Sequence, residues 1–511
     1  MLTIASVSSF LVADMKILLD TNIIIHLEDN KEVSEQFSDL IRQCSEHSIG
    51  VFVHPASIED IKRDNDAARR KVTLSKVRKF QQLENVLSPP EAKLAKLYGP
   101  LKKANDVCDA KMLHAVDKGI VDVFITEDDR LHRRAKLVNL SNQVLTVAEA
   151  LVWLKRLYGV ERVFLPTVQD VKAYNVNFED PIFTTLAADY GRKKFAEWTS
   201  KCEKEHRDCW VVMDGADLAG LVIRKNETHA EAGTRNLGPK ILKICTFKVA
   251  DGHHGFKIGE QLLKQVLWHV QRNRYDLTYL TVYPKQEALI RLIEEYGFRH
   301  TLDMPNGEQI YEKVVKRGAL KRAAGQTALE AAREHYPRFC DDAVVSKFVI
   351  PIKPGYHAKL FPEVTAPPAG TTGVGAKPGN TVKKVYICNT PSNQMEPGDL
   401  IFFYMTKSTG YGSQSLTSLG VVESVRITSD VHELRRWTAK RSVFTDAELG
   451  AWVTKPLKVI DFLLIGHLEP TLDRGFLNSE NVINAWPQSV TKLSSTAYKN
   501  LKPMLNLGFK F

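Results

Sequence analysis

Short apolar runs alternate with stretches of helical spacing along the first two thirds of this chain. The run Ile17–Leu19 and the run Val121–Ile125 are apolar throughout, which is typical of strands buried on both faces of a parallel sheet. In the last third, Gly420–Ile427 and Val459–Ile465 are strand-like, with few helical segments between them. The pattern predicts an α/β chain that ends in a mainly β domain.

The length of 511 residues is enough for about three domains. The pattern divides the chain into 15–155, 160–315, a basic linker at 316–345, and 346–511. Residues 1–14 precede the first strand, and we interpret them as an extension from an upstream start codon. Val364 to Asn380 is rich in glycine, proline and threonine and predicts a loop. Two helices are expected inside the last domain, at Val431–Trp437 and Asp446–Trp452.

Four carboxylates recur where a site could form in the first domain. Asp20 follows the first buried strand and Asp128 follows the strand that ends at Ile125, while Glu59 and Asp109 lie in helical stretches. The carboxyl ends of strands are where open α/β sheets place their sites. Four carboxylates that converge would repel one another unless a cation were bound, and oxygen ligands suit Mg²⁺ or Mn²⁺. A lone aspartate is more often a surface charge.

With these motifs, residues 15 to 155 resemble a PIN-domain nuclease. Asp20 stands in Leu-Leu-Asp-Thr-Asn, and Asp128 ends a strand followed by Thr-Glu-Asp. The resemblance implies a PIN-like α/β/α sandwich and a metal-dependent endoribonuclease. Its metal ligands or water-positioning groups would be Asp20, Glu59, Asp109 and Asp128, with Asn22 and Thr126 as supporting donors and Asp106 and Asp129 as alternates. This fold is common among toxins, so a toxin-like or defence role with an antitoxin-like partner is a hypothesis by fold analogy.

The second domain has a hairpin around Asp214-Gly215, a long strand at 240–249, a glycine-bearing loop and a helix. Free amides at a helix N-terminus bind pyrophosphate, and glycine lets the backbone come close. A strand at 279–283 and a helix that ends in Tyr-Gly-Phe follow. In this order, residues 160 to 315 resemble a GNAT acetyltransferase. The resemblance implies that acetyl-coenzyme A is bound by His254, Gly255, Phe256, Lys257, Ile258 and Gly259.

Three positions depart from that family's pattern. His254 stands where Arg or Gln is usual, and Lys257 replaces a glycine of the loop. Lys257 either contacts a phosphate or blocks it. Ile293 occupies the place of the tyrosine that often acts as general acid, which leaves Tyr296 and Tyr283 as candidates.

In the third domain, Met395 to Tyr404 contains a Pro-Gly-Asp turn that leads into an apolar strand. This arrangement resembles an ASCH or PUA-like domain, which implies a β-barrel that binds RNA, tRNA included. A basic and aromatic cluster would contact the RNA: Arg435, Arg436, Trp437, Lys440 and Arg441. The family's Gly-x-Lys-x-x-Glu-x-Arg segment is not found around 379–389.

The net charge of +10 favours a polyanionic partner. Seven scattered cysteines without a Cys-x-x-Cys pair argue against a disulfide framework, and no apolar run could span a bilayer, so a cytoplasmic, membrane-free protein is expected. Three hypotheses remain. The chain is a metal-dependent ribonuclease with an acetyl-CoA-binding domain; an acetyltransferase acting on RNA, an aminoacyl group or protein lysine, whose PIN-like domain does not cleave; or a non-catalytic RNA-binding regulator.

Overall fold

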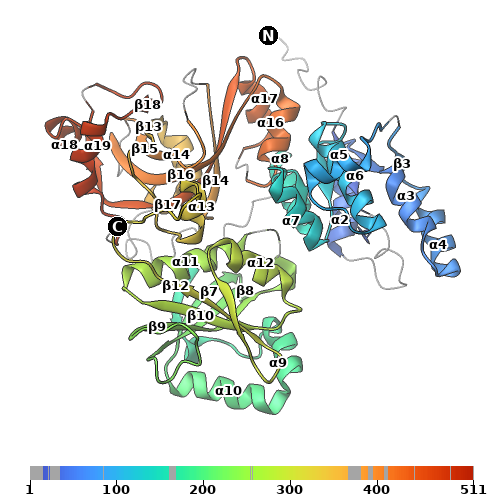
Figure 1. The fold of residues 1–511 in the computed structure, drawn as a ribbon, viewed down its shortest axis with the longest axis horizontal. Coiled ribbons are helices and arrows are strands. Elements are labelled where there is room, and N and C mark those ends of the chain that lie inside the picture. The colour runs from blue at the N-terminus through green and yellow to red at the C-terminus, as the bar shows by residue number, and fades with distance from the viewer. Residues whose placement is uncertain are drawn as a thin grey trace, which may run out of the picture. The chain divides into compact units, whose positions relative to one another are not determined.

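The computed structural model describes residues 15–20, 22–23, 35–84, 86–159, 168–253, 255, 257–365, 381–389, 395–407, 413–441, 444–483 and 485–509. The chain divides into two compact units (Figure 1). We call residues 1–163 with 428–456 the N-terminal unit, and residues 164–427 with 457–511 the large unit. In the described segments, no helix is long and apolar enough to cross a membrane.

The N-terminal unit contains a five-stranded parallel sheet in the order β3-β2-β1-β4-β5. Its strands are β1 (Lys16–Leu19), β2 (Gly50–Val53), β3 (Gln81–Gln82), β4 (Val123–Ile125) and β5 (Val144–Leu145). The apolar residues of β1 and β4 are at most 1% exposed, as their unbroken apolar runs predict. The chain moves from β1 outward to β3 and then returns to β4, so the topological switch point lies between β1 and β4.

The helices of this unit are α2 (Glu35–Glu46), α3 (Pro55–Lys62), α4 (Ala67–Val77), α5 (Glu91–Tyr98), α6 (Ala104–Asp117), α7 (Asp129–Leu137) and α8 (Val147–Leu157). Helix α6 contacts α3 and α5, and α2 contacts α8. The sequence predicted a helix that begins at Asp109, but α6 begins five residues earlier, which places Asp109 inside the helix. Helix α3 is capped by the His54 ring, which accepts a hydrogen bond from the Ala56 amide at 2.9 Å.

Two helices from the last third of the chain belong to the N-terminal unit. They are α16 (Val431–Thr438) and α17 (Asp446–Trp452), at the predicted positions. The Asn142 side chain donates to the Trp437 carbonyl at 3.1 Å, and Lys440 pairs with Glu149 at 3.0 Å. Because β16 leads into these helices and β17 follows them, they are an insertion in the last sheet that packs on the first domain.

The first sheet of the large unit has seven strands in the order β11-β12-β10-β9-β8-β7-β6. They are β6 (Val168–Lys172), β7 (Asp208–Asp214), β8 (Asp217–Glu227), β9 (Ile241–Val249), β10 (Leu277–Val282), β11 (Arg299–Asp303) and β12 (Gln309–Val314). Helices α9 (Thr184–Tyr190), α10 (Arg192–Lys204), α11 (Ile258–Arg272) and α12 (Glu287–Glu295) accompany it (Figure 1). Along β7, Trp210 and Val212 belong to the core under α11, whereas Cys209 and Val211 belong to the core under α10, so both faces are covered.

The second sheet of the large unit has six strands in the order β14-β17-β16-β15-β13-β18. They are β13 (Lys347–Ile352), β14 (Lys383–Cys388), β15 (Leu400–Met405), β16 (Ser415–Thr428), β17 (Leu457–Asp473) and β18 (Thr491–Lys492). The helices beside it are α14 (Pro354–Leu360), α15 (Pro362–Thr365), α18 (Arg474–Ser479) and α19 (Ser495–Leu501). The predicted barrel is therefore corrected: over the described residues, β14 and β18 are the ends of an open sheet.

A single apolar core joins the two sheets of the large unit. It contains Trp268 of α11, Tyr336 and Leu400, all at most 8% exposed. The linker predicted to be helical over 316–340 contains one short helix, α13 (Ala328–Glu334), whose Ala331 and Ala332 are fully buried in this core. The segment is thus a packed part of the unit and not a spacer.

Candidate functional site

Strands β9 and β10 separate part of the way along the seven-stranded sheet. Their parallel pairing ends at Ile244 and Leu280. Beyond that pair, β9 continues to Val249 hydrogen-bonded to β8 only, and β10 continues to Val282 paired with β12. A gap therefore opens at the carboxyl ends of these two strands, and one backbone edge of β9 faces it. Backbone N–H and C=O groups along such an edge can pair with an extended ligand.

Helix α11 begins beside this gap. Ile258, its first residue, is 1% exposed, and a Cβ on Gly220 of β8 would lie 2.5 Å from the Ile258 side chain. Glycine at 220 thus lets the helix start sit against the sheet. A Cβ on Gly259 would lie 3.3 Å from Leu292, so little space remains there. The amides of the first turn have no partner within the helix and attract anions, as predicted.

The loop before α11 contains two residues with left-handed backbone. Gly255 has φ +87° and Lys257, the N-cap residue, has φ +60°. This conformation costs a non-glycine residue about 1–2 kcal/mol. The structure therefore places Gly255, Lys257, Ile258 and Gly259 around the helix start, while His254 and Phe256 lie outside the described residues.

The three positions considered for the general acid differ in burial. Ile293 is fully buried, and Tyr296 is 1% exposed with its ring 5.4 Å from that of Tyr336. Both belong to the shared core, so neither reaches the gap. Tyr283 directly follows β10 and is partly exposed. It is the one of the three at the end of the separated strands.

Three of the four predicted carboxylates interact electrostatically in the N-terminal unit. Asp20 follows β1, Asp128 follows β4, and Asp109 projects from α6. Burial, and then the charges of Asp20 and Asp128, raise the pKa of Asp109 to about 7. Thr126 donates to Asp20 at 2.5 Å and accepts from the Asp128 amide at 3.0 Å, which fixes two of the acids at the switch point. Asn22 contacts the same Thr126 hydroxyl at 3.4 Å.

Glu59 does not join them. Its side chain is 63% exposed and pairs with Lys62 at 2.8 Å, and the hydrogen bond from Lys62 lowers the pKa of Glu59. Its neighbour Asp60 acts electrostatically on Cys108, as Asp109 and Asp20 also do. In the part of the chain that the structure describes, no three His, Cys, Asp or Glu residues are grouped to hold a metal ion.

The two alternate acids have other partners. The Asp106 carboxylate accepts from the Lys102 and Lys103 amides at 2.7 and 2.9 Å and pairs with Arg134 at 3.3 Å, so it caps α6. Asp129 is the first residue of α7.

The basic cluster predicted to contact RNA has a structural role instead. Arg435 makes a two-pronged ion pair with Asp446, and Arg436 lies 4.0 Å from Asp122. Lys440 pairs with Glu149. Each of these three cations is at most 14% exposed, so they hold the α16–α17 insertion on the N-terminal unit. Arg436 also pairs with Glu433 on its own helix at 3.5 Å, whereas Asp122 and Glu149 lie far away in sequence and no sequence pattern reveals them.

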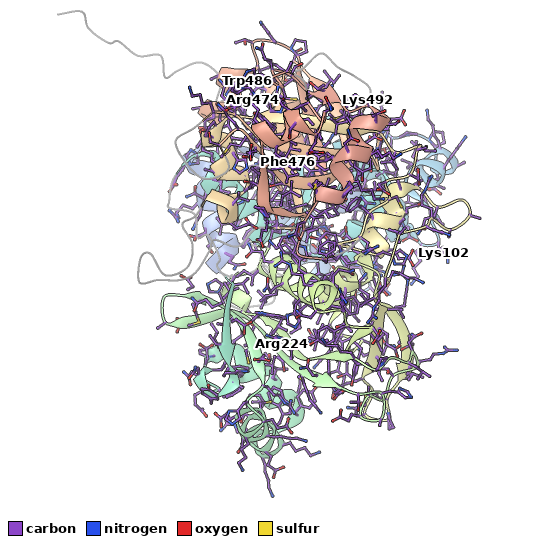
Figure 2. The ribbon with its side chains drawn as sticks, turned by 90° about the vertical axis from the view of Figure 1, so that its left-hand side faces the viewer. Lys102, Arg224, Arg474, Phe476, Trp486 and Lys492 are labelled. Carbon is purple, nitrogen blue, oxygen red and sulfur yellow. The ribbon has the colours of Figure 1, made fainter. Side chains whose placement is uncertain are left out.

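A different aromatic and basic surface lies on the six-stranded sheet (Figure 2). Trp486 is 42% exposed, and the Arg474 guanidinium lies 3.7 Å from its ring centre. Lys492 lies 5.9 Å from the ring of Phe348, but that ring is 1% exposed and belongs to the core. Exposed rings and guanidinium planes can stack on bases. RNA binding stays a prediction, and this surface is the one we would test for it.

Buried polar side chains link α11 to the six-stranded sheet. Lys264 lies 3.1 Å from Glu363, and Glu363 lies 3.4 Å from the His467 Nε2 atom. The other His467 nitrogen, Nδ1, lies 2.8 Å from the Ser418 hydroxyl. Burial lowers the pKa of His467. No local sequence pattern indicates this group, because 99 positions separate Lys264 from Glu363.

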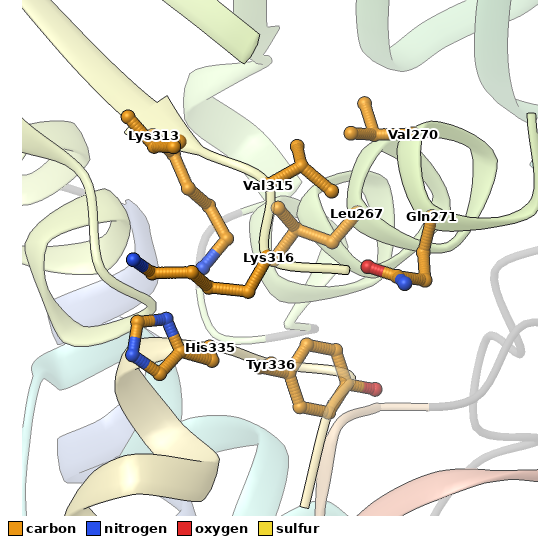
Figure 3. A pocket seen from close by; sticks show the side chains of 9 residues that line it. Leu267, Val270, Gln271, Lys313, Val315, Lys316, His335 and Tyr336 are labelled. Atoms are coloured by element: carbon orange, nitrogen blue, oxygen red, sulfur yellow. The ribbon is translucent and has the colours of Figure 1, made fainter. Parts of the chain in front are cut away.

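A small cavity lies beside Lys313 (Figure 3). Its volume of about 10 Å³ is enough for one water molecule. The Lys313 ammonium donates to the carbonyls of Tyr296 and Glu334, at 2.6 Å each, near the ends of α12 and α13. Burial lowers the pKa of Lys313 to about 7. Lys313 thus stabilises two helix ends, and the cavity is too small for a substrate.

Comparisons with known proteins bear on the large unit. Residues 171–298 match the acetyltransferase (GNAT) family, so this part of the chain is a GNAT acetyltransferase domain. No curated protein matches significantly. The chain is similar to the structure of ASCH from Zymomonas mobilis, with 15% identity over 31% of this chain and 95% of that one, at a TM-score of 0.23. It is also similar to Arabidopsis thaliana NAA60 bound to a bisubstrate analogue, with 16% identity, 29% and 98% coverage and a TM-score of 0.23. A putative GNAT acetyltransferase from Desulfovibrio desulfuricans is also similar, with 15% identity over 29% of this chain and 98% of that one, at a TM-score of 0.21.

The comparisons confirm the GNAT part of the sequence prediction and the mixed α/β, multidomain character of the chain. The similarity of residues 15–155 to a PIN-domain nuclease stays a prediction.

Proposed function

We propose that the large unit transfers an acetyl group from acetyl-coenzyme A to an amine. The observation that carries this proposal is the start of α11 beside the gap between β9 and β10, within a GNAT domain. The first-turn amides at Ile258 and Gly259 would hold the pyrophosphate. The backbone edge of β9 beyond Ile244 would pair with the amide groups of the pantetheine arm.

When bound, acetyl-coenzyme A supplies a thioester carbon that an amine can attack. The new bond joins the amine nitrogen to the acetyl carbon, and the carbon–sulfur bond breaks. We assign the Tyr283 hydroxyl to protonate the leaving thiolate, since Tyr283 follows the separated end of β10. The nitrogen loses its proton to water, and the Tyr283 oxygen takes a proton back from water.

Thiol release from acetyl-coenzyme A tests this assignment. Acceptors to compare are a lysine-containing peptide, an aminoacyl-tRNA and an RNA oligonucleotide. We expect release with at least one acceptor, and we expect Tyr283→Phe to lower kcat by about 10²-fold with little change in KM. Tyr296→Phe, a change in the buried core, serves as the matched control. No release with any acceptor would rule out the acetyltransferase.

A second candidate function belongs to the N-terminal unit. The observation that favours phosphodiester hydrolysis is the repulsion that Asp20 and Asp128 exert on Asp109 at the switch point. Carboxylate oxygens suit Mg²⁺ or Mn²⁺ chemically, but the described acids are not grouped to hold an ion, so we derive no metal-dependent step. RNA cleavage that is lost in Asp20→Asn would support this function, and its absence in the wild type with Mn²⁺ present would exclude it.

Asp109 should make the stability of the N-terminal unit depend on pH. Because its folded pKa of about 7 exceeds the ordinary value of 3.8, its contribution is complete below about pH 4 and is lost as the pH rises to about 7. We expect Asp109→Asn to raise stability by roughly 2–4 kcal/mol at pH 8 and by little at pH 4. Urea unfolding of both proteins at the two pH values measures this. Identical pH dependence in the variant and the wild type would contradict the account.

A further inference from the structure

Helix α9 contacts both sides of the gap between β9 and β10. Lys248, near the end of β9, donates to Thr185 at 2.8 Å, and Lys285, just beyond β10, donates to Asp189 at 2.7 Å. Tyr190, the last residue of α9, donates to Glu308 at 2.5 Å. No residue of α9 is buried. Polar contacts therefore hold this helix across the open end of the two strands.

Glu308 lies next to Tyr283, the proposed proton donor to the leaving thiolate. Val282 pairs with Gln309, so the next residues outward, Tyr283 and Glu308, are neighbours across β10 and β12. The rings of Tyr190 and Tyr283 lie 6.0 Å apart. Tyr190, Tyr283 and the Glu308 carboxylate thus lie together at the open end of the gap.

The Glu308 carboxylate has only neutral partners. It is 6% exposed and accepts from the Tyr190 hydroxyl and, at 2.8 Å, from the Asn306 amide. Across the described segments it forms no salt bridge, whereas nearby Asp189 pairs with Lys285. Burying a carboxylate without a cation is costly, so a cationic ligand would bind there favourably.

We propose that Glu308 docks the acceptor of the acetyl group, and that this acceptor presents a primary ammonium. The inference rests on the proposed acetyltransferase function. An ammonium supplies the charge that Glu308 lacks, and it takes the hydrogen-bonding position that the Tyr190 hydroxyl now fills. An RNA acceptor would bring its phosphates toward the Glu308 carboxylate, while the nearby Lys285 is already paired with Asp189.

Two variants with opposite expected effects test the site. Glu308→Gln removes the negative charge, and we expect the KM for a lysine-containing peptide to rise at least tenfold. Tyr190→Phe removes the competing hydroxyl, and we expect that KM to fall about two- to fivefold. Asp303→Asn, at a 74% exposed carboxylate of the same hairpin, is the matched control and should change KM less than twofold.

Calorimetry with coenzyme A separates this proposal from the one on which it rests. All three variants should bind coenzyme A as the wild type does, which also shows that they are folded. If the wild type binds no coenzyme A, the acetyltransferase function fails. If coenzyme A binds and acetyl transfer occurs, three outcomes would overturn the docking role of Glu308. The first is an equal KM in Glu308→Gln and Asp303→Asn, and the second is a KM that rises in both Tyr190→Phe and Glu308→Gln. The third is preferred acetylation of an RNA oligonucleotide.

Discussion

Replacing Glu363 with leucine is expected to destabilise the large unit by about 3–5 kcal/mol, because the change leaves the Lys264 ammonium buried without its partner. The two side chains are 13% and 7% exposed and lie 3.1 Å apart. Although burial opposes ionisation, Lys264 and His467 hold the pKa of Glu363 below its ordinary value. Urea unfolding of the single variant measures the loss.

The double variant Lys264→Met with Glu363→Leu is the control. It removes both charges and keeps side chains of similar size, so we expect it to regain most of the lost stability. A coupling free energy of about 2 kcal/mol or more between the two positions supports a direct ion pair. A coupling below about 0.5 kcal/mol would show that the pair does not stabilise the junction between α11 and the six-stranded sheet.

Charge reversal at Lys257 is expected to weaken coenzyme A binding by roughly 30- to 300-fold. Lys257 is the N-cap residue of α11, where the amides of the helix would meet the pyrophosphate. A glutamate there replaces a charge-assisted contact, worth about 1.5–3 kcal/mol, with repulsion. Isothermal titration of Lys257→Glu against the wild type measures the change.

Lys257→Gly is the informative control for the same position. Glycine adopts φ +60° without strain, so this variant should be more stable by about 1 kcal/mol. If lysine contacts a phosphate, the variant should bind coenzyme A about tenfold more weakly. Tighter binding in Lys257→Gly would mean that the lysine blocks the phosphate, contrary to our account.

Local patterns in the sequence predicted most elements. The apolar run at Ile17–Leu19 became β1, and the helical spacing after Gly259 became α11, since these signals depend on neighbouring residues alone. The two inserted helices α16 and α17 were also expected. Helix starts were less accurate, as α6 shows, because capping by residues such as Asp106 competes with apolar spacing.

Contacts between distant residues could not be predicted. The predicted barrel would have required β14 to pair with β18, and over the described residues they are instead the two ends of an open sheet, which no local pattern determines. The sequence pattern did not reveal that Glu59 lies exposed on α3 and pairs with Lys62, because one position corresponds to about 100° around a helix. Asp122 and Glu149, which pair with Arg436 and Lys440, come from the first domain. The sequence pattern of the basic cluster therefore predicted an exposed RNA-contacting surface and did not reveal these ion pairs.

The most direct test of the account is calorimetric titration of the wild-type chain with coenzyme A. We predict saturable binding to one site in the micromolar range, with a marked loss of affinity in Lys257→Glu. A folded wild-type chain that releases no binding heat over a range of temperatures, and that coenzyme A does not stabilise against heat, would contradict the claim that the start of α11 and the gap between β9 and β10 form a cofactor site.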